Sequence, residues 1–419
     1  MSGKLVRTLK FKVDTEDSKL LDWLRKEFRN TWNQYIKHTE ELGTTNRREL
    51  EEQEVETSLI QNTRQCARDK AREAVKSFFK QKKHNNNASY PEPKKRPMAA
   101  RLNHRDGYTV NKDHTVRIST RPYKTVKGKL KGSPKDEKLL NKTIKGEYKF
   151  GTAELTKHGN NHYLHINIEN GEKPSYNKDE EHTFIGVDLN ESNITLSAVN
   201  EGGEVLETLL LEYKQIKSVK HKYFTIRKRM QKHGKKLILH NKEERIIKDL
   251  VHKISRIAVE FSKRFNNSVL VLEDLTNIRD NMEFDKKNNR RLHNWNFKKL
   301  KHYITYKAEW CGVYVHEVRP DHTSQTCPVC GDQDSNYKNG RRFKCNCGHQ
   351  DHRDRNASLN IALKAMKKLL DSKNVPSLKN FPSFEKVRWM ASGLVNRPAE
   401  DIAKMSCSPS GSPTAQPCG

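Results

Sequence analysis

The chain has 419 residues, and its 81 Lys and Arg against 52 Asp and Glu leave a formal net charge of +29. A compact protein with this charge repels itself, so we expect a polyanionic partner, and basic residues spread along most of the chain favour nucleic acid. The length predicts two or three domains, and no apolar run approaches the roughly 18 residues of a membrane-spanning helix.

Neither the amino terminus nor the cysteines indicate export. The opening stretch MSGKLVRTLKFKV lacks the apolar core of a signal peptide, and eight cysteines in a chain this long do not make a disulfide framework. Four of them cluster within residues 327–347, which indicates a metal site in a reducing compartment. We therefore expect a soluble cytoplasmic protein.

The amino-terminal part of the chain predicts one strand followed by two helices. Residues 4–13 alternate apolar and polar side chains, as a strand does, and spacings of three and four predict helices from about Thr15 and over 54–82. The second helix has a basic side opposite its apolar stripe, which we expect to face solvent or a phosphate backbone. Its members are Arg64, Arg68, Lys70, Arg72, Lys76, Lys80 and Lys82.

A β-rich region follows a linker. Residues 84–97 combine asparagines, prolines and charge, which is typical of a linker. From about Tyr108 to Ile168 the apolar period changes to two and predicts strands, the last two joined by a tight turn at 159–161. We expect these strands and residues 4–13 to form one small β unit, interrupted by a helical insertion at 15–83.

A second pattern begins at Thr183 and predicts a mixed sheet flanked by helices. The apolar run SVLVLEDL within it is typical of a strand buried on both faces. The predicted elements are strands at 183–189, 193–200 and 204–211, a basic helical region at 213–265 broken near Gly234, the buried strand, a helix at 296–311, a strand at 313–318, the cysteine loop, and a helix at 356–370. Ser, Pro and Gly become frequent from 371 onward, which predicts disorder.

Two carboxylates close buried apolar strands, because Asp188 ends FIGVD and Glu273 ends VLVLE. A buried carboxylate is costly unless a cation or hydrogen bonds satisfy it, and adjacent strands of one sheet would bring these two close together. Asp354, just before the final predicted helix, would supply a third acid. Three converging carboxylates repel one another, and a divalent metal relieves the repulsion while orienting water for attack on phosphate.

Each acid has an alternative role. Asp354 could cap its helix, Asp188 could anchor a turn with the asparagine two residues on, and Glu273 could pair with a lysine. The neighbouring acids Asp274 and Asp351 compete for the roles of Glu273 and Asp354. Strand alternation settles only that Glu273 and its neighbour face opposite ways.

The cysteine loop predicts a structural zinc site. Cys327 and Cys330, followed by a glycine, form a strong half-site because two thiolates at this spacing can turn onto one ion. Cys345 and Cys347 are one residue closer than is usual, so His349 is kept as a substitute ligand for Cys345. A closed site of this kind would fold a loop that has few apolar residues and place it beside nucleic acid.

Four stretches in the second half of the chain carry a family resemblance. They are GVDL at 186–189, VLEDL at 271–275, NWNFKKLKHYITYKAEWCGVYVHEVRPDHTSQTCPVCG from 294 and CGHQDHRDRNASLNI from 347. These stretches resemble the TnpB proteins of bacterial and archaeal insertion-sequence transposons and, more loosely, the type V CRISPR effectors. The match is dense from Thr183 to Leu370 and holds only in outline before it.

The resemblance implies an α/β multidomain protein with a RuvC-like nuclease domain of RNase H fold, an inserted zinc knuckle, and an amino-terminal wedge β-barrel carrying a helical recognition insertion. The implied parts are the first barrel strand (1–14), the recognition insertion (15–83), a linker with the rest of the barrel (84–180), the first part of the nuclease domain (181–326), the zinc-binding knuckle (327–349), the last part of the nuclease domain (350–370) and a disordered tail (371–419).

Members of the family are RNA-guided DNA endonucleases, in which a guide RNA transcribed from the element's end pairs with double-stranded target DNA beside a short motif that the protein reads. The resemblance implies that Asp188, Glu273 and Asp354 are catalytic and hold two Mg²⁺ ions about 4 Å apart, with Mn²⁺ as a substitute. It places structural Zn²⁺ on the four clustered cysteines, Cys327, Cys330, Cys345 and Cys347. We expect one protein per guide RNA, acting on the nucleoid of a prokaryote.

Candidate contacts with nucleic acid lie on the predicted helices. LIQNT at 59–63 is similar to the family's helix that approaches the target-adjacent motif, which makes Gln61 a candidate. Arg64, Lys76 and Lys232 are further candidates on basic helices that would track phosphates. Asn190 replaces a glycine usual in the family, and asparagine tolerates the left-handed backbone of a turn.

Three other interpretations are open. A guided DNA-binding repressor would not cleave, although such a relative would be expected to have lost at least one of the three acids. A compact type V CRISPR effector would perform the same chemistry in another genomic setting, which a repeat array beside the gene would reveal. A transposase acting on its own element's ends could use the same fold, but the resemblance indicates a companion of the transposase.

Overall fold

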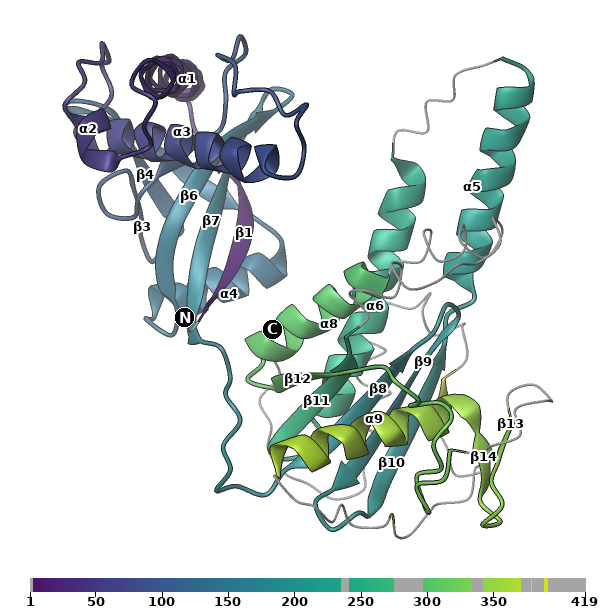
Figure 1. Ribbon diagram of the computed structural model, residues 1–419. Coiled ribbons are helices and arrows are strands. Elements are labelled where there is room, and N and C mark those ends of the chain that lie inside the picture. The colour runs from purple at the N-terminus through teal and green to yellow at the C-terminus, as the bar shows by residue number, and fades with distance from the viewer. Residues whose placement is uncertain are drawn as a thin grey trace. The chain divides into compact units, whose positions relative to one another are not determined.

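The computed structural model describes residues 3–234, 241–274, 297–333, 342–370, 378 and 388–390. The chain divides into two compact units, Met1–Glu172 and Lys173–Cys418 (Figure 1). Within the described residues, no helix combines the length and the apolar character needed to cross a membrane.

The amino-terminal unit is built on a seven-stranded antiparallel sheet in the order β2-β6-β7-β1-β5-β4-β3. Its strands are β1 (Lys4–Asp14), β2 (Ala100–Leu102), β3 (Tyr108–Val110), β4 (Thr115–Arg121), β5 (Lys124–Lys131), β6 (Lys149–His158) and β7 (Asn161–Glu172). The sheet curls into a nearly closed barrel. Its two ends come close together, since the Tyr108 hydroxyl on edge strand β3 donates a hydrogen bond to the Gly151 carbonyl on β6 at 2.8 Å. Strand β1 lies at the centre, and Leu9, Phe11 and Val13 point into the core.

Helices of the amino-terminal unit follow β1 and β5. Three of them separate β1 from β2: α1 (Ser18–Glu41), α2 (Arg47–Glu51) and α3 (Gln61–Lys82). The helix expected over 54–82 thus begins seven residues later, at Gln61. The sequence analysis also missed α2, β2, β5 and a fourth helix, α4 (Pro134–Ile144), although Ser133 caps α4 by accepting a hydrogen bond from the Asp136 backbone N–H at 3.2 Å.

The carboxy-terminal unit contains a six-stranded mixed sheet in the order β12-β11-β8-β9-β10-β15. Its strands are β8 (Thr183–Leu189), β9 (Asn193–Asn200), β10 (Val205–Glu212), β11 (Ser268–Glu273), β12 (Tyr314–Val318) and β15 (Arg388–Met390), and a separate pair is formed by β13 (Arg342–Lys344) and β14 (Gln350–His352). Strand β9 runs antiparallel to both of its neighbours, β8 and β10, whereas β11 is parallel to both β8 and β12.

Helices cover both faces of this sheet, as its nearly all-apolar strands require. The helices are α5 (Gln215–Lys232), α6 (Lys242–Ser262), α8 (Phe297–Trp310) and α9 (Arg353–Leu369). Side chains of α6 and α8 form one core with the sheet, and α9 forms a second core on the opposite face (Figure 1). The mixed sheet flanked by helices is therefore confirmed.

Two parts of the expected disordered segment 371–419 have places in the fold. Leu378 is buried in the core beneath α9, and β15 pairs in parallel with β10, where Leu210 lies opposite Trp389. The expectation of disorder does not hold for these residues, because even a three-residue stretch can add to the edge of a sheet through backbone pairing. The other residues of 371–419 lie outside the described part.

Candidate active site and metal sites

Asp188 and Glu273 lie side by side on neighbouring strands. Strand β8 pairs in parallel with β11, and the register places Val187 opposite Leu272, one residue before each acid. In a parallel pair that keeps this register, the next two side chains point to the same face of the sheet. The expectation that these acids occupy adjacent strands is confirmed.

Asp354 reaches the same place from α9. It is the second residue of that helix rather than the residue before it, and His352 is the N-cap that accepts the Asp354 backbone N–H at 3.3 Å. Helix α9 lies close against β8 at Gly186, where a Cβ atom would collide with the Ser358 carbonyl oxygen and lie 2.7 Å from the Ala362 nitrogen. Glycine at this point of β8 therefore allows α9 to pack directly against the strand.

The three carboxylates share one electrostatic site. Asp188 is 9% exposed, and its pKa is raised well above the ordinary range by burial first and then by the charges of Asp354 and Glu273. Burial also raises the pKa of Glu273. Among the described residues, the four clustered cysteines have ligand atoms that all lie within 4.8 Å of one another, and the three acids do not. The carboxylates therefore converge without touching.

Neutral donors orient each carboxylate. Asn190 Nδ2 donates to Asp188 Oδ2 at 2.6 Å, and Asn193 Nδ2 donates to Asp354 Oδ2 at 2.5 Å. The Thr323 hydroxyl donates to Glu273 Oε1 at 2.6 Å. These bonds fix the side chains without neutralising them, so the remaining negative charge is suited to a divalent cation.

The β8–β9 turn carries two of these donors. Asn190 does not use the left-handed backbone that asparagine tolerates, since its φ is not among the positive values found in the described chain. The buried Tyr213 hydroxyl donates to the Asn190 carbonyl at 2.5 Å, and the Asn190 backbone N–H donates to the Asn193 carbonyl at 2.9 Å. The sequence analysis missed Asn193, Thr323 and Tyr213 as site residues, and only the spacing of two asparagines after Asp188 signalled the turn.

The competing acids have other environments. Asp351 is 7% exposed and lies 3.4 Å from the guanidinium of buried Arg355, four residues on. The Asp274 backbone N–H donates to the Val318 carbonyl at 2.7 Å, and its carboxylate lies 3.8 Å from the Lys301 ammonium. Each therefore faces a cation of the chain, whereas the strongest charges acting on Asp188 are those of two further acids, with Arg353 acting more weakly in the opposite sense.

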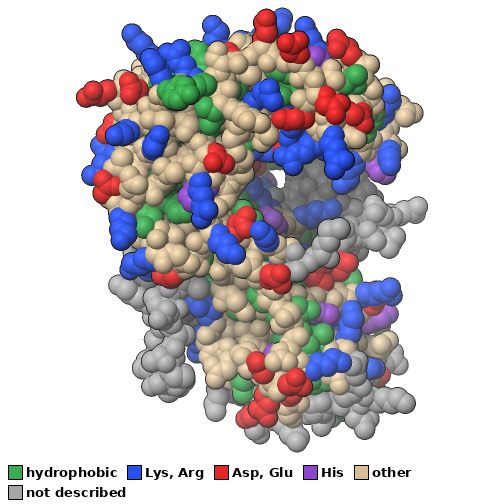
Figure 2. Space-filling view, turned by 90° about the vertical axis from the view of Figure 1, so that its left-hand side faces the viewer, with side chains coloured by type: hydrophobic (Ala, Val, Ile, Leu, Met, Phe, Trp, Pro, Cys, Tyr) green, Lys and Arg blue, Asp and Glu red, His purple; other side chains and the backbone are tan. Residues whose placement is uncertain are grey.

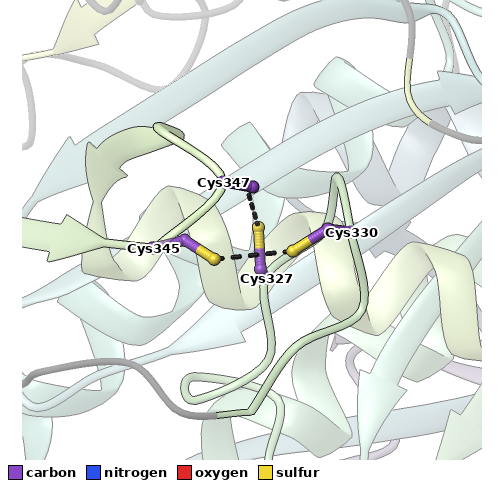
Figure 3. Close-up of side chains that lie close together, drawn as sticks. All are labelled: Cys327, Cys330, Cys345 and Cys347. Carbon is purple, nitrogen blue, oxygen red and sulfur yellow. Dashed lines mark hydrogen bonds between the residues drawn. The ribbon is translucent and has the colours of Figure 1, made fainter.

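The four clustered cysteines meet at one point (Figure 3). Their sulfur atoms all lie within 4.8 Å of one another, with Cys327 Sγ 3.7 Å from Cys347 Sγ and Cys330 Sγ 3.4 Å from Cys345 Sγ. Cys345 belongs to the group despite its short spacing from Cys347. His349 is not needed as a substitute, and its ring packs near that of Phe343 instead.

The donor set fits zinc. Four thiols within reach of one centre are the ligands of a closed tetrahedral site, which is structural because it keeps no open position. Burial raises the pKa of the Cys327 thiol to about 12, whereas the His349 backbone N–H lowers that of Cys347 to about 7. Zinc binding would release thiol protons and stabilise the loop that precedes α9.

The four candidate nucleic-acid contacts differ in their surroundings. Gln61, at the start of α3, Lys76 and Lys232 are exposed. Arg64 is partly buried and lies 3.2 Å from Glu51. Figure 2 shows lysine and arginine side chains scattered among acidic ones on one face of the molecule, without a single dense basic patch.

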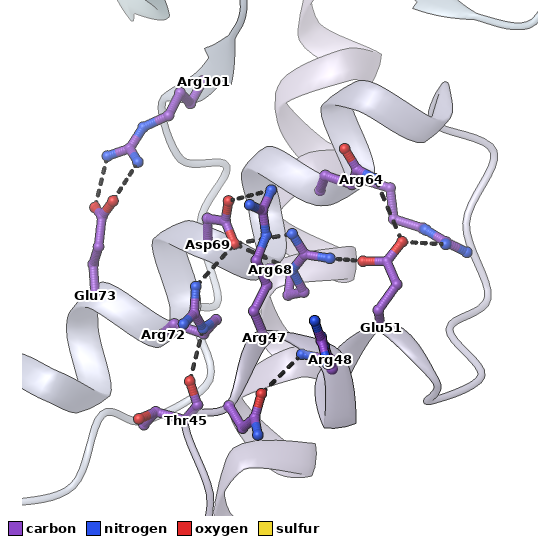
Figure 4. Close-up of polar contacts among 12 residues, drawn as sticks. Thr45, Arg47, Arg48, Glu51, Arg64, Arg68, Asp69, Arg72, Glu73 and Arg101 are labelled. Atoms are coloured by element: carbon purple, nitrogen blue, oxygen red, sulfur yellow. Dashed lines mark hydrogen bonds and ion pairs between the residues drawn. The ribbon is translucent and has the colours of Figure 1, made fainter.

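The basic side expected on α3 is largely paired within the chain (Figure 4). Arg68 is 2% exposed and forms ion pairs with Glu51 and with Asp69, the latter at 3.1 Å. Arg72 lies 3.3 Å from Asp69, and Lys70 lies 2.7 Å from Glu154. The expectation that these charges face solvent or phosphate is wrong for Arg68, because α2 supplies an acid that covers it.

Two relatives match the chain in sequence. The "TnpB-like protein MJ0751" of Methanocaldococcus jannaschii is 33% identical over 262 residues, which are 60% of this chain and 90% of that protein. The "CRISPR-associated endodeoxyribonuclease Cas12f1" of Sulfoacidibacillus thermotolerans is 38% identical over 121 residues, 28% of this chain and 27% of its own length. Residues 297–361 match the family described as "Cas12f1-like, TNB domain".

Solved structures share the fold. The "Cryo-EM structure of the Cas12f1-sgRNA-target DNA complex" aligns with a TM-score of 0.58 at 17% identity, covering 83% of this chain and 82% of that one. The "Structure of the mini-RNA-guided endonuclease CRISPR-Cas_phi3" aligns with a TM-score of 0.54 at 10% identity, covering 89% and 93%. At these identities the likeness shows the fold alone.

Proposed function

The chain belongs to the TnpB-like protein family, which is related to the compact type V CRISPR effectors, and on this premise we propose that it is an RNA-guided DNA endonuclease. The proposed reaction is metal-dependent hydrolysis of a phosphodiester bond in DNA next to a short motif. The setting we favour is an insertion-sequence transposon. Guide pairing would select the sequence, while the protein reads the flanking motif and the backbone shape.

The convergence of Asp188, Glu273 and Asp354 carries this proposal. Burial first and then the charges of Asp354 and Glu273 raise the pKa of Asp188, and pKa values perturbed in this way cluster at functional sites. The hydrogen bonds to the three carboxylates come from amides and a hydroxyl, which leave their charge in place. Carboxylate oxygens are the ligands that Mg²⁺ and Mn²⁺ prefer.

We assign these three acids as the residues that would hold two Mg²⁺ or Mn²⁺ ions. Bound ions supply Lewis-acid activation of water and neutralise charge on the leaving oxygen. Asn190 and Asn193 hold the carboxylates of Asp188 and Asp354 in one rotamer each. The burial of Asp188 keeps bulk water from competing for its oxygens.

The rest of the chain is assigned to binding and support. Support for a wedge barrel with a helical recognition insertion comes from the nearly closed sheet and from α1–α3, which lie between β1 and β2. We assign the mixed sheet with α9 to a RuvC-like nuclease domain and the cysteine loop to a structural zinc knuckle. A net charge of +29 suits guide RNA and double-stranded DNA as partners, with one protein per guide RNA in the cytoplasm of a prokaryote.

A compact type V CRISPR effector is the second candidate. The 38% identity to a Cas12f1 endodeoxyribonuclease over 121 residues favours it, whereas the longer match to a TnpB-like protein favours the transposon setting. Both would perform the same chemistry. A transposon end or a repeat array next to the gene distinguishes them.

Plasmid cleavage tests the activity. The protein is purified with its copurifying RNA, the RNA is sequenced, and a plasmid library carrying the matching target with randomised flanks is offered with Mg²⁺. The parent should cut a subset of flanks, and Asp354→Asn should reduce the rate at least about 10³-fold. The matched control Asp249→Asn, on the exposed side of α6, should cut like the parent. Equal cutting by Asp354→Asn and the parent would overturn the assignment.

A further inference from the structure

The β4–β5 hairpin ends in a tyrosine that is fully exposed. Pro122 and Tyr123 form the two-residue connection between the paired residues Arg121 and Lys124. The exposure of Tyr123 is 106%, more than any other large hydrophobic side chain in the described part of the chain. A single exposed apolar side chain is common on protein surfaces, so what singles out this ring is its exposure together with the backbone and the charges around it.

The backbone at Tyr123 also disfavours a tyrosine. Its φ is +62°, a left-handed conformation that glycine and asparagine adopt with little strain and bulky residues adopt at a cost. Short hairpins ordinarily place glycine, asparagine or aspartate at such positions. The turn therefore retains a strained residue whose ring makes no aromatic, cation–π or side-chain hydrogen-bond contact among the described residues.

The hairpin that presents this ring is entirely basic in its charge. Residues 115–131 contain six cations and no acid: Arg117, Arg121, Lys124, Lys127, Lys129 and Lys131. Arg117 lies directly opposite Lys127, and Arg121 lies opposite Lys124, all on the exposed side. Like charges placed directly opposite in a sheet destabilise it.

Only part of this charge is balanced within the chain. Lys131 pairs with Asp14 at 2.5 Å, and the Arg121 guanidinium lies over the Trp23 ring at 5.6 Å. For Arg117, Lys124 and Lys127, the described residues supply no carboxylate within ion-pair distance. The two cross-strand pairs of cations, Arg117 with Lys127 and Arg121 with Lys124, lie behind the exposed Tyr123 ring. Together they offer what a single nucleic-acid strand requires, namely cations for its phosphates and a flat surface for an unpaired base.

We propose that the tip of the β4–β5 hairpin binds an unpaired base of the guide RNA, which stacks on the Tyr123 ring while Arg117, Lys124 and Lys127 contact the flanking phosphates. This inference rests on the proposed function, which supplies a resident RNA. RNA is chosen over target DNA because a guide RNA has unpaired bases in its loops and ends that can stack on an aromatic ring, whereas duplex DNA keeps its bases stacked within the helix.

Binding of the copurified RNA, transcribed in vitro and labelled, tests the ring. Tyr123→Ala and Tyr123→Gly should each weaken affinity between about 5-fold and 100-fold, the range found for single stacked bases. Tyr123→Phe keeps the ring and should bind within about twofold of the parent. Because glycine relieves the left-handed strain, Tyr123→Gly should unfold at a temperature no lower than the parent, which separates lost contact from lost folding.

Two further measurements identify the ligand and the cations. Ultraviolet crosslinking of the RNA complex followed by peptide mapping should place a nucleotide on Tyr123, and a DNA of the same sequence should crosslink less. The double variant Arg117→Gln with Lys127→Gln should lower the slope of log affinity against log salt by about 1.4, since each phosphate contact to a single strand contributes about 0.7.

The outcomes separate this inference from the proposed function. If the parent binds its RNA and cuts the plasmid while Tyr123→Ala and Tyr123→Gly bind like the parent, the tip assignment is wrong and the nuclease stands. The assignment is also wrong if Tyr123 crosslinks to target DNA in place of RNA. It is wrong as well if a Tyr123 variant keeps its RNA affinity but no longer binds a protein that the parent binds. If no RNA copurifies and no plasmid is cut, both proposals fall.

Discussion

Two regions of this protein bury charged side chains, and they do so in opposite ways. In the network around α2 and α3, buried Arg68 lies between Glu51 and Asp69, so each charge has a partner within the chain (Figure 4). At the ends of β8 and β11 and the start of α9, three acids face one another with neutral donors. In the first arrangement acids and arginine neutralise one another within the chain. In the second, burial and the neighbouring acids outweigh the weaker effect of Arg353 on the pKa of Asp188. Burial likewise outweighs the effects of Lys364 and Lys301 on the pKa of Glu273, which favours an added cation.

The comparison shows that charge density on a helix or strand does not identify a binding site. Seven basic residues on α3 suggested a phosphate-binding side, yet Arg64, Arg68, Lys70 and Arg72 have acidic partners within the unit. What distinguishes a ligand site is whether the fold supplies the opposite charge. Buried groups without it are costly and are retained where a ligand compensates.

Asp188→Asn should have the largest effect. It removes one ligand of the proposed ions and should reduce plasmid cleavage at least about 10³-fold, or about 4 kcal/mol of activation free energy. The same change should stabilise the protein in EDTA, because it removes a buried charge that two neighbouring acids repel. Cleavage rates with Mg²⁺ and thermal unfolding in EDTA give the two values, and a variant that is both inactive and less stable would contradict the electrostatic account.

The pH dependence in EDTA sharpens this prediction. The folded-state pKa of Asp188 is raised, so the fold favours the protonated carboxyl. The free energy of unfolding should therefore fall as pH rises from the ordinary carboxyl pKa through the raised one, and stay low above it. Asp188→Asn should flatten that fall, and saturating Mg²⁺ should do the same in the parent. Parallel pH profiles for parent and variant in EDTA would argue against this cause.

Arg68→Met tests the self-neutralised region and should act on stability alone. It leaves Glu51 and Asp69 without their shared cation, and since both acids are about 30% exposed, we expect about 2 to 3 kcal/mol of destabilisation rather than the larger loss of a fully buried pair. Urea unfolding measures it. Adding Glu51→Gln should recover part of the loss, and Lys76→Met on the exposed side of α3 should change stability by less than about 0.5 kcal/mol.

Asn193→Ala should have the smallest effect and act on cation affinity. Losing the amide that orients Asp354 should raise the Mg²⁺ concentration for half-maximal cleavage about 10-fold to 100-fold, with partial rescue at high Mg²⁺. The control Asn141→Ala, on α4 of the other unit, should leave this concentration unchanged. A loss of rate at every Mg²⁺ concentration with no shift in the midpoint would show that Asn193 does not act through the cations.

The sequence predicted strands and helices best where their packing requires a recognisable pattern of apolar residues. The strands at 183–189 and 193–200 and the run SVLVLE appear as β8, β9 and β11, because strands buried on both faces must be almost wholly apolar. It failed where local signals were weak or overlooked. The cap at Ser133 and the proline after it marked α4, and the three-residue strands β2 and β15 are too short to show a period.

The candidate acids could be identified from the sequence because each lies at the end of an apolar run or at the start of a helix. The four cysteines could be identified because their spacing suits one ion. Their catalytic role remains a prediction. What the sequence could not reveal is which side chains complete the site. Asn193 and Thr323 reach the acids from 161 and 50 residues away, and such distances carry no periodic signal.

By itself the sequence determined most of the longer strands and helices, the excess of positive charge and the residues able to bind metal, because these depend on composition and local spacing. Only the tertiary structure decided that Asp188 lies among acids of its own charge while Arg68 lies between acids that neutralise it. It also decided that Cys345 rather than His349 completes the sulfur cluster and that Tyr123 is exposed to water. Whether a charge or a ring finds its partner within the chain depends on residues far away along it, which only folding brings together.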